Sequence, residues 1–196
     1  MTRKIPFTRD LYVVSASVAE LKRAIDDGAS IVQLRDKTSD EHSILEKARE
    51  LGEYRSLRPF IFILNDDPLL AVLASADGVH VGQDTSTVEA RKVIGEGMIL
   101  GKTTHDLEQA RQAIRDGADY ISVGPVYTTP TKPGRPAVGL EYVREAAENL
   151  DVPFVAIGGI DLTNVDDVLA AGAKTIGVVR AFKDTAQLLK RIRKDR

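Results

Sequence analysis

The densest group of side chains capable of chemistry is the run Gln33-Leu34-Arg35-Asp36-Lys37. If this run ends an extended strand, alternation places Gln33, Arg35 and Lys37 on one side and Leu34 on the other. Arginine supplies a planar fork of donors and lysine a point charge, and both suit phosphate oxygens. Two interpretations stay open, an anion clamp and a pair of ordinary surface cations.

Carboxylates follow two later apolar runs, at Asn65-Asp66-Asp67 and at Asp84. Asp67 precedes Pro68 and is typical of a helix N-cap, since proline favours the first helical position. Asp66 and Asp84 then remain at neighbouring strand ends, where two carboxylates can share one Mg²⁺ ion. Each aspartate taken singly is equally compatible with a cap.

Hydroxyls, prolines and one lysine are concentrated in a later loop, at Thr129, Pro130, Thr131 and Lys132. The composition is typical of a lid over a site, although a plain surface loop is the alternative. Gly158-Gly159 and Val179-Arg180 follow two further apolar runs, and bare glycine backbone can approach an anion closely. These segments together predict a phosphate site.

The three histidines give a weaker signal. His42 falls in an expected outer helix and His80 inside an expected strand, so both are interpreted as structural. His105 follows the fifth apolar run and could serve as an acid or base, or equally as a cap or packing residue. No Ser-His-Asp order and no histidine metal spacing is present.

The elements that would position these residues are eight short apolar runs, each followed by a longer segment with helical spacing. The runs cover residues 11–14, 31–35, 60–64, 78–81, 98–101, 120–123, 154–157 and 175–179. Their lack of alternation is typical of parallel strands buried on both faces. We predict a (β/α)8 TIM barrel, with an open doubly wound sheet as the alternative. In a barrel the chemistry belongs at the carboxyl ends of the strands, where the proposed anion, metal and phosphate residues above fall, together with His105.

The bulk properties agree with one water-soluble domain spanning residues 1–196. The chain is 43% hydrophobic and 29% charged, with a net charge of −2 and no cysteine. Disulfides, thiolate metal sites and cysteine nucleophiles are therefore excluded, and a surface for nucleic acid is not expected. No apolar stretch is long enough to span a membrane, and the first residues lack a secretory pattern, so we expect a cytoplasmic location. The oligomeric state stays open.

Five motifs in order resemble the thiamine phosphate synthase family, from Leu11 to about Ala181. They are Gln33-Leu34-Arg35-Asp36-Lys37, Asn65-Asp66-Asp67, Gly78-Val79-His80-Val81-Gly82-Gln83, Thr129-Pro130-Thr131-Lys132 and Ala156-Ile157-Gly158-Gly159-Ile160. The family joins 4-amino-2-methyl-5-(diphosphooxymethyl)pyrimidine to a thiazole phosphate, giving thiamine phosphate and pyrophosphate. The resemblance therefore implies a transferase of thiamine biosynthesis with two small-molecule substrates.

The resemblance also implies a role for each matching residue. The pyrimidine diphosphate would be held by Gln33, Leu34, Arg35, Asp36, Lys37 and Asn65, with Thr103 where the family usually has a serine. Mg²⁺ would be held by Asp66 and the aspartate of the Gly-Gln loop. Arg35, Lys37 and Lys132 would neutralise the leaving group. The thiazole phosphate would be received by Thr129, Pro130, Thr131, Gly159 and the backbone of Val179 and Arg180.

Two departures from the family pattern affect these roles. Gly82-Gln83 is followed directly by Asp84, with Thr85 at the place of the usual acid, so we suppose a deletion of one residue that brings Asp84 to the metal. Arg180 stands where a serine is common. Two other functions are kept as alternatives: a thiazole tautomerase using His105, and a phosphate-ligand sensor without turnover.

Overall fold

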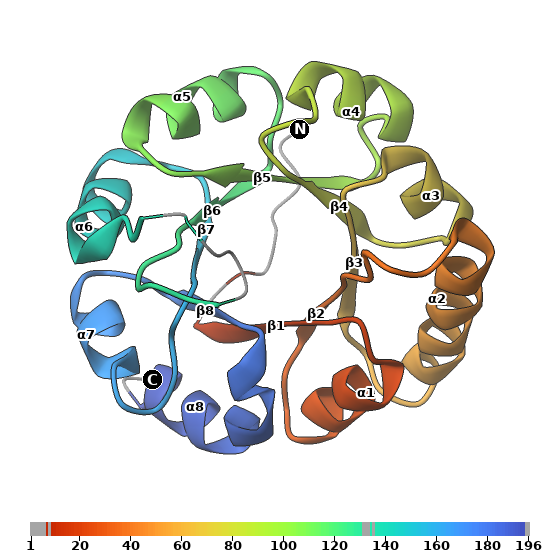
Figure 1. Ribbon diagram of the computed structural model, residues 1–196, viewed down its shortest axis with the longest axis horizontal. Helices are drawn as coiled ribbons and strands as arrows, with labels where there is room; N and C mark the ends of the chain where they lie inside the picture. The colour runs from red at the N-terminus through yellow and green to blue at the C-terminus, as the bar shows by residue number, and fades with distance from the viewer. Residues whose placement is uncertain (1–6, 8, 131–133, 135, 195–196) are drawn as a thin grey trace.

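The chain folds into a closed barrel of eight parallel strands in the order in which they occur in the sequence (Figure 1). The computed structural model describes residue 7 and residues 9–130, 134 and 136–194. The strands are β1 (Asp10–Ser15), β2 (Ile31–Leu34), β3 (Ile61–Asn65), β4 (Gly78–Val81), β5 (Ile99–Thr104), β6 (Tyr120–Val123), β7 (Phe154–Ile157) and β8 (Thr175–Val178). The barrel prediction is confirmed.

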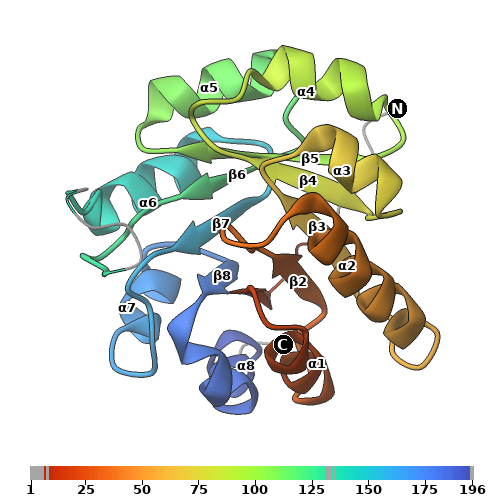
Figure 2. The ribbon, with the colours of Figure 1, turned by 45° about the vertical axis from the view of Figure 1, so that its right-hand side comes forward.

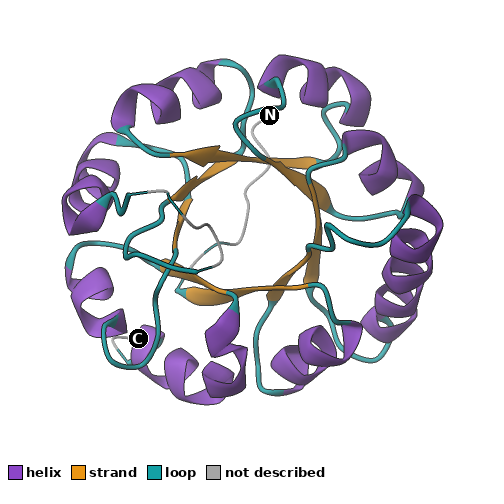
Figure 3. Cartoon of the chain, viewed as in Figure 1, coloured by secondary structure: helices purple, strands orange, loops and turns teal. Residues whose placement is uncertain are grey.

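Pairing between the first and last strands closes the sheet. Tyr12 of β1 is in register with Gly177 of β8 on one side and with Ile31 of β2 on the other. An open doubly wound sheet would leave two edge strands instead, so that alternative is wrong. Because the ring is closed, the carboxyl ends of all the strands meet around one mouth (Figure 3).

Helices cover the outside of the barrel and alternate with the strands (Figure 2). They are α1 (Val18–Asp26), α2 (Glu41–Arg55), α3 (Pro68–Leu73), α4 (Thr87–Ile94), α5 (Leu107–Arg115), α6 (Gly139–Asn149), α7 (Val165–Ala170), the 3₁₀ helix η1 (Arg180–Asp184) and α8 (Thr185–Ile192). Several begin at a side-chain cap, and Asp67 caps α3 by accepting from the Leu70 amide at 2.9 Å, as its place before Pro68 predicts. Among the described residues, no helix is long and apolar enough to cross a membrane.

Tight turns return the chain from helix to strand. Gly28, Gly117 and Gly172, which follow α1, α5 and α7, have φ of 104°, 98° and 101°. These positive φ angles favour glycine, so the three glycines allow the chain to leave each helix.

Two apolar cores form, one on each face of the sheet. The larger lies between strands and helices, and the smaller fills the barrel around Phe7, Tyr12, Ile63 and Tyr120. The Phe7 ring packs edge-on against Tyr120, with 4.7 Å between ring centroids. This inner plug closes the lower part of the barrel and leaves the mouth open.

Candidate active site

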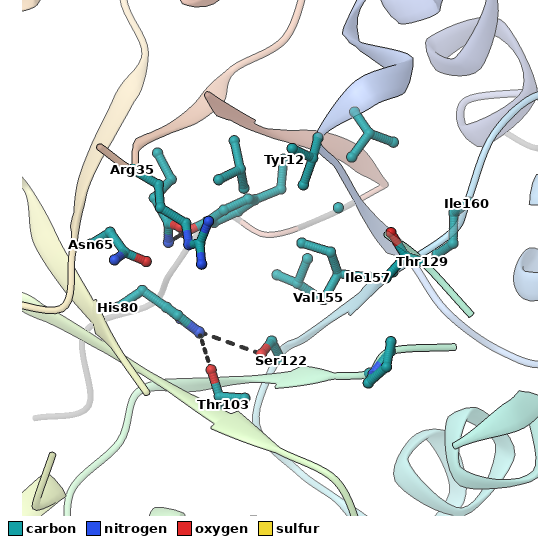
Figure 4. Close-up of a pocket in the computed structure, with 18 of the residues that line it drawn as sticks. Tyr12, Arg35, Asn65, His80, Thr103, Ser122, Thr129, Val155, Ile157 and Ile160 are labelled. Atoms are coloured by element: carbon teal, nitrogen blue, oxygen red, sulfur yellow. Dashed lines mark hydrogen bonds between the residues drawn. The ribbon is translucent and has the colours of Figure 1, made fainter. Parts of the chain in front are cut away.

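A cavity of about 760 Å³ opens at the carboxyl ends of the strands. Its lining includes twelve of the residues that the sequence singled out: Gln33, Arg35, Lys37, Asn65, Asp66, Asp84, Thr103, His105, Thr129, Gly159, Val179 and Arg180. Figure 4 shows Arg35 and Asn65 on one side of this space and Thr129 on the other. Residues far apart in the chain thus share one site, with a cationic end and a hydroxyl and glycine end.

Five predicted site residues are absent from this lining or cannot be placed: Leu34, Asp36, Pro130, Thr131 and Lys132. Leu34 is 1% exposed and belongs to the outer core, because alternation turns it away from the barrel interior. Pro130 is not among the lining residues. Thr131 and Lys132 lie outside the described residues. For Leu34 and Pro130 the geometry gives no side-chain contact with a ligand in the cavity.

Asp36 is the clearest correction, because its carboxylate serves the loop after β2. It accepts hydrogen bonds from Thr38 and Ser39, through the backbone N–H and the hydroxyl of each residue, at 2.7–3.1 Å. Lys47 forms an ion pair with the same carboxylate. These partners hold the pKa of Asp36 far below its usual range, and the side chain is only 3% exposed. Asp36 shapes the loop that carries Lys37 rather than facing the cavity.

Lys37 and Asp66 meet across the cationic end of the cavity. Their ammonium and carboxylate groups are 3.0 Å apart and both remain substantially exposed, at 55% and 43%. Asp66 has φ of 68°, in the left-handed region that aspartate tolerates better than most residues, and its N–H donates to the carbonyl of His80 at 2.8 Å. The backbone therefore turns at the end of β3 so that this carboxylate faces the cavity.

The turn at residues 82–85 carries Asp84, and hydrogen bonds from the Lys102 side chain hold this turn in place. The Lys102 ammonium donates to the carbonyls of Gly82 at 2.7 Å and Thr85 at 2.5 Å. Lys102 faces the helix layer, because its neighbours Gly101 and Thr103 face the barrel interior. Partial burial lowers the pKa of Lys102, and the nearby Asp84 carboxylate opposes that shift.

Asp66 and Asp84 line the same cavity and offer oxygen ligands of the kind that Mg²⁺ prefers. An ideal Cβ on Gly82 would lie 3.7 Å from Oδ1 of Asp66, so the turn that carries Asp84 passes close to this carboxylate. Within the described part of the chain, no group of three or more histidine, aspartate and glutamate side chains could hold a metal. Two carboxylates fit a Mg²⁺ ion that takes its other ligands from water and substrate phosphate.

A buried polar network forms the floor of the cavity, and the sequence reasoning missed most of it. Gln33 contacts the Tyr12 hydroxyl, which contacts the Tyr120 hydroxyl, which contacts Nδ1 of His80. Figure 4 shows Nε2 of His80 directed at the hydroxyls of Thr103 and Ser122. His80 is therefore a lining residue as well as a structural one. The available signal was Gly101, which ends the expected fifth run and lies inside β5 in the structure.

That glycine is required by the network itself. A Cβ at Gly101 would lie 2.2 Å from the Tyr120 ring and 2.4 Å from Nδ1 of His80. Gly101 is in register with His80 on one side and Tyr120 on the other, so the missing side chain makes room for both rings. Small residues in a strand thus mark where large inward side chains meet.

The opposite end of the cavity is built from glycine backbone. Gly158 and Gly159 have φ of 106° and 69°, and a Cβ on either would lie under 3 Å from Pro125 or Tyr127. The Tyr127 N–H donates to the Gly158 carbonyl at 2.9 Å, which fastens the loop after β6 to β7. The glycine pair thus serves close packing of this loop as well as lining the cavity.

Arg180 begins η1 at the same end and lines the cavity. Its positive charge adds to the Thr163 hydrogen bonds that hold the pKa of Asp161 below its usual value. His105 also lines the cavity, and its Nδ1 lies 2.5 Å from the carbonyl of Gly124. Because a carbonyl only accepts, that nitrogen carries the hydrogen.

The sequence matches one family over most of its length. A family model described as thiamine monophosphate synthase matches residues 8–182. The thiamine-phosphate synthase of Thermus thermophilus is 49% identical over 172 residues, which cover 87% of this chain and 83% of that protein. That of Nostoc punctiforme is 43% identical over 182 residues, covering 90% of this chain and 52% of that protein. The chain spans about half the length of the cyanobacterial relatives that it matches.

A solved structure agrees with the sequence comparison. The thiamine phosphate pyrophosphorylase from Pyrococcus furiosus superposes with a TM-score of 0.87 at 29% identity, over 96% of this chain and 98% of that one. The whole barrel is therefore shared, including the strand ends that form the cavity.

Proposed function

The chain belongs to the thiamine monophosphate synthase family, and from this membership we propose that it joins an aminopyrimidine methyl diphosphate to a thiazole phosphate. The products would be thiamine phosphate and pyrophosphate. The observation that carries the proposal is the gathering of Arg35, Lys37, Asn65, Asp66 and Thr103 in one cavity at the barrel mouth. A volume of about 760 Å³ is ample for two small substrates.

The proposed reaction breaks the bond between the pyrimidine methylene carbon and the diphosphate oxygen, whose electron pair leaves with pyrophosphate. A new bond forms between that carbon and the thiazole nitrogen, whose lone pair attacks. No side-chain nucleophile is required, so the protein contributes positioning and charge. Arg35 and Lys37 face the cavity as cations and would stabilise the negative charge that develops on the leaving group. Lys132 is proposed to add a third cation.

Mg²⁺ is part of the proposal. Asp66 and Asp84 would hold the ion, which supplies positive charge against the diphosphate oxygens. Lys37 pairs with Asp66 and Lys102 fixes the turn that carries Asp84, so both carboxylates are held before any ion arrives.

The other end of the cavity is proposed to receive the thiazole phosphate. Gly159 and the backbone at Val179 and Arg180 offer N–H groups, and Thr129 offers a hydroxyl. The enclosing barrel would limit attack by water on the activated methylene carbon. We also propose a cytoplasmic location, because both substrates carry phosphate and would not cross a membrane unaided.

The tautomerase and sensor alternatives are not favoured. The relatives reported above are named synthases, and the cavity keeps Arg35, Lys37, Asn65 and Asp66, the set that departure of a diphosphate is proposed to use. His105, the acid or base that a tautomerase would need, lies against the Gly124 carbonyl through Nδ1.

The test is pyrophosphate release by the purified protein with each component omitted in turn. Release that requires the pyrimidine diphosphate, the thiazole phosphate and Mg²⁺ together supports the synthase. Absence of release under all conditions, with both substrates still bound, contradicts it and supports the sensor.

A further inference from the structure

A polar network at the floor of the cavity joins Gln33 to Thr103. Tyr12, Tyr120 and His80 lie between them. Gln33 donates from Nε2 to the Tyr12 oxygen at 2.8 Å, and the Tyr12 and Tyr120 oxygens are 2.9 Å apart. The Tyr120 oxygen lies 3.0 Å from Nδ1 of His80. On the other side of the imidazole ring, Nε2 lies 3.1 Å from the Thr103 hydroxyl. This hydrogen-bond network runs from Gln33 in β2 across the barrel floor to Thr103 in β5.

The number of hydrogens that each group carries gives the hydrogen-bond network a direction. A phenol has one hydrogen, and desolvation raises the pKa of both tyrosines, which keeps that hydrogen in place. Gln33 donates to Tyr12, and the one other contact of the Tyr12 hydroxyl with a described residue is Tyr120, so the arrangement in which every hydroxyl donates directs the Tyr12 hydrogen to Tyr120. The Tyr120 hydrogen is then directed to Nδ1 of His80, which must be bare. A neutral imidazole with a bare Nδ1 carries its hydrogen on Nε2, which lies 3.1 Å from the Thr103 hydroxyl and farther, at 3.4 Å, from that of Ser122, so it donates to Thr103.

The direction decides what each end presents to a ligand. With Nε2 of Gln33 donating to Tyr12, its Oε1 is the acceptor that remains for a ligand. With its oxygen accepting from His80, the Thr103 hydroxyl is left to donate, and no described residue takes its hydrogen. One acceptor and one donor therefore face the cavity.

We propose that Tyr12, Tyr120 and His80 are positioning residues that fix this polarity, so that Gln33 recognises an amino group and Thr103 a ring nitrogen of the heterocyclic substrate. An aminopyrimidine carries both features, so the inference rests on the proposed function. If every hydrogen bond of the network were reversed, the Gln33 amide would flip and the His80 hydrogen would move to Nδ1. Gln33 would then present a donor to the ligand and Thr103 an acceptor. A pocket whose polar groups mismatch its ligand discriminates strongly against that ligand.

The direct test reads the histidine tautomers by ¹⁵N NMR in protein labelled on histidine, without ligand, at about pH 8.5, where imidazole is neutral. His80 is expected with its hydrogen on Nε2 and His105 with its hydrogen on Nδ1. The exposed His42 is assigned by its loss in His42→Gln. A His80 hydrogen on Nδ1 overturns the proposal.

A variant designed to reverse the hydrogen bonds of the network tests whether a change at Gln33 reaches His80. In Gln33→Glu the carboxylate can only accept, so Tyr12 must donate to it and each later hydrogen turns around. The His80 hydrogen is expected to move to Nδ1, although the substitution lies two hydroxyls away. Tyr142→Phe is the matched control, because it removes another buried hydroxyl pair, with Thr104 at 2.7 Å, outside the cavity lining. It should leave the His80 tautomer unchanged, and an unmoved tautomer in Gln33→Glu overturns the proposal.

Kinetics then connect polarity to substrate recognition. Tyr120→Phe breaks the chain and is expected to raise KM for the pyrimidine diphosphate about tenfold, with KM for the thiazole phosphate unchanged. Thr103→Val should have a similar effect, Thr103→Ser should restore wild-type KM, and the Tyr120→Phe/Thr103→Val pair should be no worse than Thr103→Val alone. Additive effects, or equal rises in both KM values, overturn the proposal. Because the tautomers are read without substrate, a protein with the expected tautomers but no pyrophosphate release would refute the proposed function alone.

Discussion

Asp36→Ala is expected to cost stability far more than catalysis, although the resemblance placed this residue among the substrate ligands. The carboxylate accepts two hydrogen bonds from Thr38 and two from Ser39, and pairs with Lys47. All of these partners belong to the loop after β2 or to α2. Removing the carboxylate leaves two backbone N–H groups of that loop without their acceptor.

The size of the loss follows from those contacts. A hydrogen bond to a charged group contributes about 1.5–3 kcal/mol, but water reaches this surface loop and replaces part of each bond. We therefore expect Asp36→Ala to lose about 2–4 kcal/mol in the free energy of unfolding. For a domain of this size each kcal/mol is worth roughly 2–4 °C, so Tm should fall by about 5–15 °C. Lys47→Met, which keeps the four loop hydrogen bonds, should lose less than half as much.

The pH dependence has a definite sign. The folded pKa of Asp36 lies well below its unfolded value of 3.8, so its contribution is fully present above about pH 4. It is lost as the pH falls through that value toward the folded pKa. The difference in urea unfolding between wild type and Asp36→Ala should therefore be largest at pH 7 and should shrink steadily as the pH falls below about 4. If Asp36→Ala unfolds within about 1 °C of wild type while kcat/KM falls a hundredfold, Asp36 contacts substrate and the structural reasoning is wrong.

Three further predictions concern the metal and the clamp. Lys102→Met should weaken Mn²⁺ binding about three- to tenfold, because the turn that carries Asp84, the proposed metal ligand, loses both ammonium hydrogen bonds, and unchanged binding in a calorimetric titration would count against that role. Asp84→Ala should raise the Mg²⁺ concentration for half-maximal activity about tenfold or more, whereas Thr85→Ala should leave it within about twofold. The reverse pattern would place Thr85 at the metal. Arg35→Ala and Lys37→Ala should each lower kcat by about 10²–10³ with circular dichroism unchanged, since each removes a cation that lines the cavity and is proposed to face the leaving group; near-normal kcat in both would refute the anion clamp.

The barrel could be predicted because its parallel strands are apolar on both faces. All eight expected runs are strands, with ends that differ by a few residues. The largest difference is at β5, expected over residues 98–101 and found at Ile99–Thr104. Its extension consists of Lys102, Thr103 and Thr104, which pair with β6 despite their polarity. Pairing with a neighbouring strand therefore outweighed the hydropathy pattern.

The site was partly predictable, because charged residues directly after a strand stand out against apolar runs. Arg35, Asn65 and Asp66 were found in this way, and all line the cavity. Tyr12 and His80 were missed, since a strand that is apolar on both faces does not reveal which of its residues point inward. That direction is set by the closed register of the barrel, which is a property of all eight strands together.

The local geometry of the loops could not be predicted from the sequence either. The Asp36 side chain turns back to Thr38, Ser39 and Lys47, and no pattern in the strand before it indicates this. The left-handed conformation of Asp66 likewise depends on its hydrogen bond to the backbone of His80 in the next strand. Such contacts join residues far apart in the chain, so spacing alone cannot show them.

The central claim is that the cavity at the barrel mouth couples two substrates, and product stoichiometry tests it most directly. Thiamine phosphate and pyrophosphate should be measured in the same reaction mixture, for wild type and for Arg35→Ala. Wild type should form one thiamine phosphate for each pyrophosphate, and the variant should form both at least a hundredfold more slowly. Pyrophosphate without thiamine phosphate, or equal rates in the two proteins, would contradict it.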